Sequence, residues 1–280
     1  MTILRARLCV GSAIIIFVCL AFAADYLWQQ PMIVAGISAV AAALGTYELC
    51  GMAKRAGKEL FPGIAVGGAV AFVAAAGIPH NGILGWDYGD VLGGIVVVLL
   101  GGALVRQRLR GTLRGALVNA GMTIFAALYV GFLLSFVMRI RLLENGGVTG
   151  VALVVFSPKL GDVGAYAFGS LLRGPKLAPM TSPNKTMAGA VGGLLVSVAV
   201  GVPVCLVSGL FSLGPAAGVS ALIGVLGQLG DLSESVIKRD LDAKDSSSSL
   251  PGFGGVLDVL DSLLFAAPAL YFVLRLSSEM

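Results

Sequence analysis

Acidic and basic side chains alternate in a polar segment near the C-terminal end of a mostly apolar sequence. The segment runs from Gly230 to Asp240. If it is helical, its polar side chains share one face, because they recur at intervals of three and four residues. These side chains are Asp231, Glu234, Ser235 and Lys238. A salt-bridged loop is the alternative interpretation.

Two more carboxylates follow at the start of the next apolar stretch. Asp258 and Asp261 come after Gly254-Gly255, and their spacing places them on one helical face. Two helices can therefore bring several carboxylates to one place beside a membrane. Oxygen ligands without histidine suit a hard cation such as Mg²⁺, which keeps waters and substrate phosphates as further ligands. Basic side chains that could neutralise phosphate charge are Lys238, Arg239 and Lys244.

Two polar segments precede these. Lys159 and Asp162 lie within an apolar stretch, where each charge costs roughly 2.5–3.5 kcal/mol on insertion scales. Such groups usually face a cavity or a pathway, so a functional site is favoured over a structural ion pair. The segment 181–189 places hydroxyls and Lys185 before a new apolar stretch, where unpaired N–H groups at a helix start attract anions. A simple helix cap with a lysine that sets topology is the alternative.

The elements that carry these residues must lie in lipid. Apolar types make up 57% of the 280 residues and charged types 12%, against about 25% charged in soluble domains. A membrane span needs about 20 mostly apolar residues. We therefore expect an all-α, polytopic membrane protein with about nine transmembrane helices. The expected spans are 8–24, 31–53, 60–78, 89–105, 115–138, 148–172, 187–209, 212–230 and 255–274.

The distribution of basic residues predicts the orientation. With a cytoplasmic N-terminus, most of the 19 lysines and arginines fall on the cytoplasmic side. The polar segments then face the cytoplasm. We expect one continuous membrane domain, with N-terminal helices in 1–150 and catalytic helices with cytoplasmic loops in 151–280. The run Ser246–Ser249, followed by Leu250-Pro251-Gly252, predicts a flexible loop.

The polar segments resemble the signature of the phosphatidate cytidylyltransferases. That signature joins Ser-x-x-Lys-Arg, four residues and Lys-Asp to a later His-Gly-Gly-x-x-Asp-Arg-x-Asp. Two further family motifs match in the right order, so the resemblance covers roughly residues 150–275. The matching stretches are Ser235–Arg239, Lys244-Asp245, Gly254–Asp261, Asp162–Tyr166 and Ser182–Thr186. The sequence departs from the family at Phe253, Val259, Met187 and Ala188.

The resemblance implies transfer of CMP from CTP to phosphatidic acid, which gives CDP-diacylglycerol and pyrophosphate. The implied catalytic residues are Asp231, Lys238, Arg239 and Asp258. The implied substrate-binding residues are Asp162, Ser182, Lys185, Thr186, Ser235, Lys244 and Asp245. The implied ligands of Mg²⁺ are Asp231 and Asp258, with Asp261 as a further ligand or a neighbour. A second cation beside the first is also expected.

The expected partners are CTP, phosphatidic acid and the lipid bilayer, with no nucleic acid, and a homodimer is a further expectation. The expected location is the cell (inner) membrane, multi-pass, with the active site at the cytoplasmic face. Three alternatives stay open: a CTP-dependent kinase of a polyprenol or phytol, a cytidylyltransferase for another lipid phosphate, and a secondary transporter. Unrelated halves and polar residues gathered at one face make transport the least favoured.

Overall fold

Helices account for nearly all of the ordered secondary structure. The computed structural model describes residues 20–21, 23–27, 31–78, 85–250 and 254–278. Its contacts divide the chain into two units. The first unit combines residues 1–139 with 241–260, and the second combines 140–240 with 261–280. The expected organisation into 1–150 and 151–280 stays a prediction.

Seven helical stretches among the described residues are long and apolar enough to cross a membrane. They are α2 (Met32–Arg55), α4 (Tyr88–Leu109), Ala116–Arg141, α7 (Gly147–Leu172), α8 (Met187–Val207), α9 (Leu213–Asp240) and α10 (Val256–Ser278). The stretch Ala116–Arg141 joins α5 (Ala116–Ala126), a π-helical segment η1 (Ala127–Phe132) and α6 (Leu133–Arg141). The chain is therefore an all-α, multi-pass membrane protein, as the sequence predicts.

Two expected spans need comment. The span predicted at 60–78 is the 14-residue helix α3 (Pro62–Ala75), about 21 Å long at 1.5 Å per residue and so shorter than a bilayer core of about 30 Å. Pro62 starts this helix at a position where proline is favoured. The span predicted at 8–24 lies mostly outside the described residues, so the expected total of nine is not tested.

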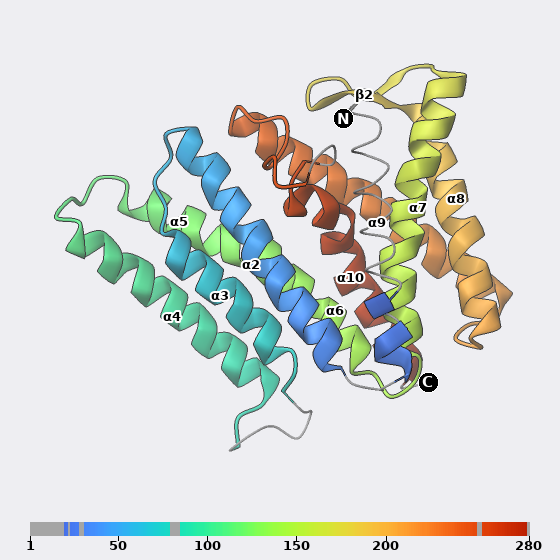
Figure 1. The fold of residues 1–280 in the computed structure, drawn as a ribbon, viewed down its shortest axis with the longest axis horizontal. Coiled ribbons are helices and arrows are strands. Elements are labelled where there is room, and N and C mark those ends of the chain that lie inside the picture. The colour runs from blue at the N-terminus through green and yellow to red at the C-terminus, as the bar shows by residue number, and fades with distance from the viewer. Residues whose placement is uncertain (1–19, 22, 28–30, 79–84, 251–253, 279–280) are drawn as a thin grey trace. The chain divides into compact units, whose positions relative to one another are not determined.

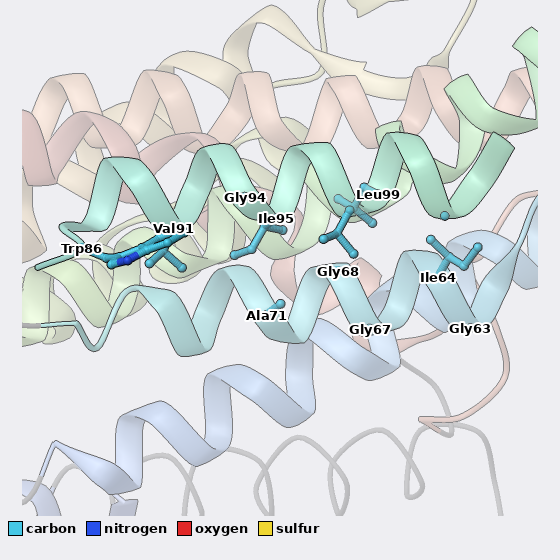
Figure 2. A pocket seen from close by; sticks show the side chains of 12 residues that line it. Gly63, Ile64, Gly67, Gly68, Ala71, Trp86, Val91, Gly94, Ile95 and Leu99 are labelled. Atoms are coloured by element: carbon cyan, nitrogen blue, oxygen red, sulfur yellow. The ribbon is translucent and has the colours of Figure 1, made fainter. Parts of the chain in front are cut away.

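In the first unit, α2, α3 and α4 lie side by side, and η1 packs against α3 (Figure 1). Phe72, Leu99 and Ala127 form part of its core. An apolar cavity of about 480 Å³ lies between α3 and α4 (Figure 2). Gly67 and Gly68 form part of its wall on α3, and a side chain at Gly68 would overlap that of Leu99, so this glycine lets α4 pack closely against α3.

In the second unit, α7, α8 and α9 pack against one another. Ser157 on α7 and Ser197 on α8 each donate a hydroxyl hydrogen bond to the other's backbone carbonyl, at 3.0 and 3.1 Å. A short antiparallel hairpin, β1 (Lys176–Ala178) and β2 (Ser182–Thr186), connects α7 to α8. The sequence did not predict this hairpin. The helix α10 contributes residues 256–260 to the first unit and 261–278 to the second.

Candidate functional site

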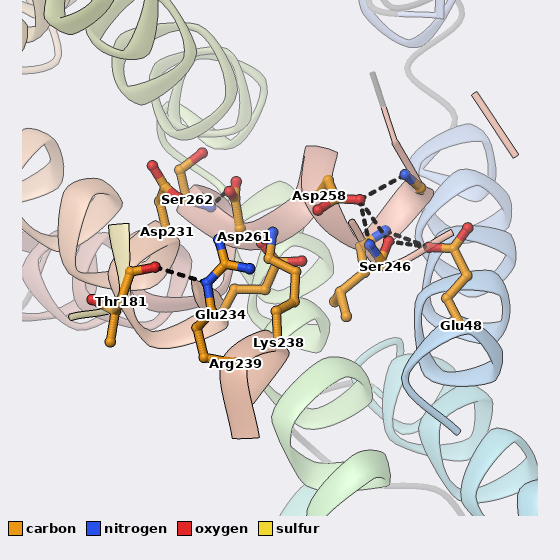
Figure 3. Close-up of polar contacts among 12 residues, drawn as sticks. Glu48, Thr181, Asp231, Glu234, Lys238, Arg239, Ser246, Asp258, Asp261 and Ser262 are labelled. Carbon is orange, nitrogen blue, oxygen red and sulfur yellow. Dashed lines mark hydrogen bonds and ion pairs between the residues drawn. The ribbon is translucent and has the colours of Figure 1, made fainter. Parts of the chain in front are cut away.

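Three carboxylates gather in the second unit. Asp231 and Glu234 on α9 and Asp261 on α10 have oxygens that all lie within 4.8 Å of one another (Figure 3). Glu234 is fully buried and Asp261 is 6% exposed. At Gly230 a side chain would overlap the carbonyl oxygen of Asp261, so glycine allows α9 to approach α10 closely enough to bring these groups together. We call these three residues the carboxylate cluster.

Two of the cluster's carboxylates pair with lysines from α9 and from the β1–β2 hairpin. Lys238 lies one turn after Glu234 on α9, with its Nζ 2.7 Å from Glu234 Oε2. Lys185 on β2 forms an ion pair with Asp231. The helix predicted for this segment is confirmed, and the inward position of Glu234 and Lys238 agrees with the shared face.

The third carboxylate pairs with a lysine from α7. Lys159 Nζ lies 2.8 Å from Asp261 Oδ1 and 3.5 Å from Asp162 Oδ2. The backbone N–H of Ser262 also donates to Asp261 Oδ1, at 2.6 Å. Lys159 and Asp162 form the ion pair expected as the alternative to a functional site, and the structure adds Asp261 as a closer partner. Each carboxylate of the cluster therefore has a lysine within ion-pair distance.

The β1–β2 hairpin holds Lys185 in place. Arg239 on α9 donates from Nε to the carbonyl oxygen of Thr181, at 3.1 Å (Figure 3), so α9 binds the hairpin at a second point. Thr186 ends β2 and caps α8, because its hydroxyl accepts the N–H of Gly189 at 3.1 Å. The helix-cap interpretation is thus confirmed for Thr186. The half-buried Ser182 lies at the start of β2.

Another pair of acids lies within the first unit. Glu48 on α2 and Asp258 on α10 both accept hydrogen bonds from Ser246 (Figure 3). The Ser246 hydroxyl is 3.0 Å from Glu48 Oε2 and 2.7 Å from Asp258 Oδ2. Asp258 Oδ2 also accepts the backbone N–H groups of Ser246, at 2.9 Å, and Gly255, at 2.7 Å. We call Glu48 and Asp258 the serine-bound acids.

Glu48 has two more donors. Ser247 donates its hydroxyl to Glu48 Oε1 at 2.6 Å, and Leu257 donates its backbone N–H to Glu48 Oε2 at 2.9 Å. The expectation of a flexible loop is wrong for Ser246, which is fully buried. The physical reason is that Glu48 and Asp258 supply acceptors that bind its hydroxyl and backbone.

The structure places the residues implied by the sequence as follows. Asp162, Lys185, Asp231, Lys238 and Asp261 lie at or beside the carboxylate cluster. Ser235 is buried next to Glu234, and Arg239 is exposed at the end of α9. Asp258, Lys244 and Asp245 belong to the first unit, where the last two are exposed. Phe253 lies outside the described residues.

Two acidic residues were not assigned a role from the sequence. Glu234 was placed on the polar face but not among the metal ligands, and the structure includes it in the cluster. Glu48 was not singled out at all. The signal that could have found it is a single glutamate within the apolar stretch 31–53, where a charge needs a partner.

The cluster's donor set fits a hard divalent cation. Its three members offer only carboxylate oxygens, and these lie close enough to share one ion. Asp231, Glu234 and Asp261 would then hold Mg²⁺. The metal role of Asp258 stays a prediction, and in the structure one of its oxygens accepts three hydrogen bonds from uncharged donors.

Comparison with known proteins gives a consistent result. A model of the "Cytidylyltransferase family" matches residues 5–277. A phosphatidate cytidylyltransferase of Bacillus subtilis is 40% identical over 168 residues, which are 57% of this chain and 60% of the relative. Its counterpart in Brucella suis is 42% identical over 146 residues, covering 51% of this chain and 53% of the relative.

A phosphatidate cytidylyltransferase of Staphylococcus aureus is 36% identical over 162 residues, covering 58% of this chain and 61% of the relative. In these comparisons the chain spans between about half and three-fifths of each relative's length. The family match, by contrast, extends over nearly the whole chain. The chain therefore belongs to the cytidylyltransferase family.

Proposed function

We propose that this protein transfers the cytidylyl group of CTP to phosphatidic acid, giving CDP-diacylglycerol and pyrophosphate. Membership of the family and the names of the relatives support this activity. The single observation that carries it is the carboxylate cluster with its three lysines. The carboxylates offer oxygen ligands for a cation, and the lysine ammonium groups offer positive charge for phosphates.

The reaction needs charge neutralisation more than it needs a base. An oxygen of the lipid phosphate attacks the α-phosphorus of CTP, the bond from that phosphorus to the α–β bridging oxygen breaks, and pyrophosphate leaves with the bonding electrons. The nucleophile is already an anion, so no histidine has to remove a proton. The main obstacle is the approach of two polyanions, which fixed cations relieve.

The lysines of the cluster are suited to this task. Lys159, Lys185 and Lys238 each pair with a carboxylate in the structure. When a cation occupies the carboxylates, these ammonium groups can turn toward phosphate oxygens, which accept charge-assisted hydrogen bonds equally well. Bound Mg²⁺ would supply the remaining charge neutralisation, held by Asp231, Glu234 and Asp261. The second cation and the metal role of Asp258 belong to this proposal on the strength of the resemblance alone.

The proposed location is the bacterial cell membrane, with the cluster facing the cytoplasm. The excess of basic residues on one side supports this orientation. The helix α9 has 28 residues and is about 42 Å long, so its last turns can reach beyond a hydrocarbon core of about 30 Å. Asp231, Glu234 and Lys238 lie on those turns. The lipid would enter sideways, with its acyl chains in the bilayer and its phosphate at the surface.

The test uses purified full-length protein, Mg²⁺, phosphatidic acid in detergent micelles, and CTP labelled either in cytosine or in the γ-phosphate. We expect the cytosine label in the lipid product, the γ-label in pyrophosphate, and no reaction when phosphatidic acid is left out. Transfer of the γ-label to the lipid would show a kinase instead. No pyrophosphate release by the folded protein would contradict the proposal.

A further inference from the structure

The N-terminus of α10 has only half of a capping arrangement within its own sequence. Gly255 immediately precedes the helix, and Asp258 is its third residue. Asp258 Oδ2 accepts the N–H of Gly255 at 2.7 Å, which is one half of a capping box. The other half needs a side chain on the preceding residue that accepts an N–H of the first turn, and Gly255 has no such side chain.

Glu48 on α2 supplies the missing acceptor. Its Oε2 accepts the N–H of Leu257, in the first turn of α10, at 2.9 Å. A side chain on Gly255 would overlap Ser246 Oγ and Glu48 Oε2, so the glycine leaves the space that the Glu48 carboxylate occupies. A negative charge at this end of a helix is also favourable because of the helix dipole.

The same face of α2 binds the segment that leads into α10. Arg55, two turns after Glu48, donates from Nη2 to the carbonyl oxygen of Ser246 at 3.0 Å. Glu48 itself accepts the hydroxyls of Ser246 and Ser247, at 3.0 and 2.6 Å. Glu48 is only 7% exposed, so its carboxylate depends on these donors. Contacts from α2 thus fix the segment at Ser246 and again at Leu257.

We propose that Glu48 is a positioning residue for the cytidylyl transfer. It caps α10 from a different helix and thereby sets the place of Asp258 and of the segment that begins at Lys244-Asp245, two parts of the signature-like sequence. This role rests on the proposed function. It also gives the Gly254-Gly255 pair a physical reason, since Gly255 makes room for the carboxylate and Gly254 has a positive φ of 93°.

The first experiment compares Glu48→Ala, Glu48→Gln and a matched control, Glu59→Gln. Glu59 is a glutamate of the same unit whose carboxylate is largely exposed and pairs with Arg110. Hydrogen exchange of the peptide that covers residues 246–257 reports on the cap directly, and pyrophosphate release gives kcat and KM. We expect Glu48→Ala to speed exchange there and to lower kcat about 10- to 100-fold, as displaced catalytic groups do. KM for phosphatidic acid should change less than about threefold, because removing positioning affects the transition state more than ground-state binding.

A compensating variant separates this role from a general loss of stability. Gly255→Ser alone should lower kcat, because its side chain overlaps the Glu48 carboxylate. Replacing both overlapping side chains, with Glu48→Ala and Ser246→Ala, leaves room for the same serine to cap α10 itself. Glu48→Ala/Ser246→Ala/Gly255→Ser should therefore have a higher kcat and slower local exchange than Glu48→Ala/Ser246→Ala. If Glu48→Ala does not fold, Glu48→Gln, which keeps one carbonyl acceptor, should show the same changes at smaller size.

Unchanged exchange at 246–257 in folded Glu48→Ala, or a triple variant no better than Glu48→Ala/Ser246→Ala, would overturn the proposal. Equal activity of Glu48→Ala and Glu59→Gln would do so as well. If the wild-type protein releases no pyrophosphate, the proposed function fails and the positioning role fails with it. Exchange would still show whether Glu48 caps α10, so the two failures can be told apart.

Discussion

The two units hold their acidic groups in contrasting ways. In the second unit, Asp231, Glu234 and Asp261 each lie against a lysine. In the first unit, serine hydroxyls and backbone N–H groups donate hydrogen bonds to Glu48 and Asp258. Both arrangements give buried or half-buried carboxylates a partner, but the partners are ammonium groups in the second unit and include uncharged donors in the first.

The difference indicates different tasks. A lysine is a flexible point charge that can leave a carboxylate for a phosphate when a cation takes its place. Backbone N–H groups move only with the chain, so they fix the direction of the carboxylates that they bind. We infer that the cluster of the second unit exchanges partners during catalysis, whereas the hydrogen bonds to Glu48 hold its carboxylate in a fixed direction.

The largest effect is expected at the cluster. Asp261→Asn removes one of the cluster's three carboxylates and should lower kcat about 100- to 1,000-fold, the cost typical of losing a main electrostatic group. Lys159 keeps Asp162 as a partner at 3.5 Å, so the fold should persist. Pyrophosphate release measured against Mg²⁺ concentration should also show weaker Mg²⁺ binding, as a higher half-saturating concentration.

Asp240→Asn is the matched control for this change. Asp240 is exposed in the last turn of α9, outside the cluster. We expect its activity and Mg²⁺ dependence to match the wild type. If Asp261→Asn and Asp240→Asn behaved alike, the carboxylate cluster would have no part in catalysis.

A smaller but still large effect is expected at Asp258. Asp258→Asn keeps a carbonyl oxygen that can accept the N–H groups of Ser246 and Gly255, and should leave the thermal unfolding temperature nearly unchanged. If Asp258 also binds the cation, kcat should fall about 100-fold despite the intact fold. Full activity of Asp258→Asn together with an inactive Asp258→Ala would assign to Asp258 only the fixed-geometry role of the first unit.

The third effect concerns Lys185, the lysine supplied by the hairpin. Lys185→Met removes the partner of Asp231 and should raise KM for CTP about tenfold, since a charge-assisted hydrogen bond is worth about 1.5–3 kcal/mol. Lys176→Met is the control, because Lys176 lies on the same hairpin and is exposed. An unchanged KM for CTP in Lys185→Met would mean that this lysine only balances Asp231.

The helical part of this comparison could be predicted from the sequence. The spacing of Asp231, Glu234 and Lys238 follows the helical period, and the structure confirms one inward face. The pairing of Lys159 with Asp162 is also local, because the two residues are three apart on α7. Apolar length likewise predicted the spans, and α9 continues from the span expected at 212–230 through the polar segment to Asp240.

The rest depends on contacts between distant residues. Glu48 meets Ser246 across 198 positions of the chain, and no local pattern predicts such a contact. The hairpin that carries Lys185 has strands of only three and five residues, and β2 contains Pro183, so the alternation that marks a strand is absent. Lys159 and Asp261 are 102 positions apart, so the local spacing indicates only Asp162 as a partner of Lys159.

The smallest effect is expected among the uncharged donors of the first unit. Ser247→Ala removes the hydroxyl that donates to Glu48 Oε1, but Glu48 Oε2 keeps the N–H of Leu257 and the hydroxyl of Ser246. The free energy of unfolding should therefore fall by about 1 kcal/mol or less, and kcat should stay within about twofold because the cap on α10 remains. Ser248→Ala, at an exposed neighbouring position, provides the baseline. A drop in kcat for Ser247→Ala as large as that for Lys185→Met would show that single uncharged donors limit catalysis, and the contrast between the two units would then no longer hold.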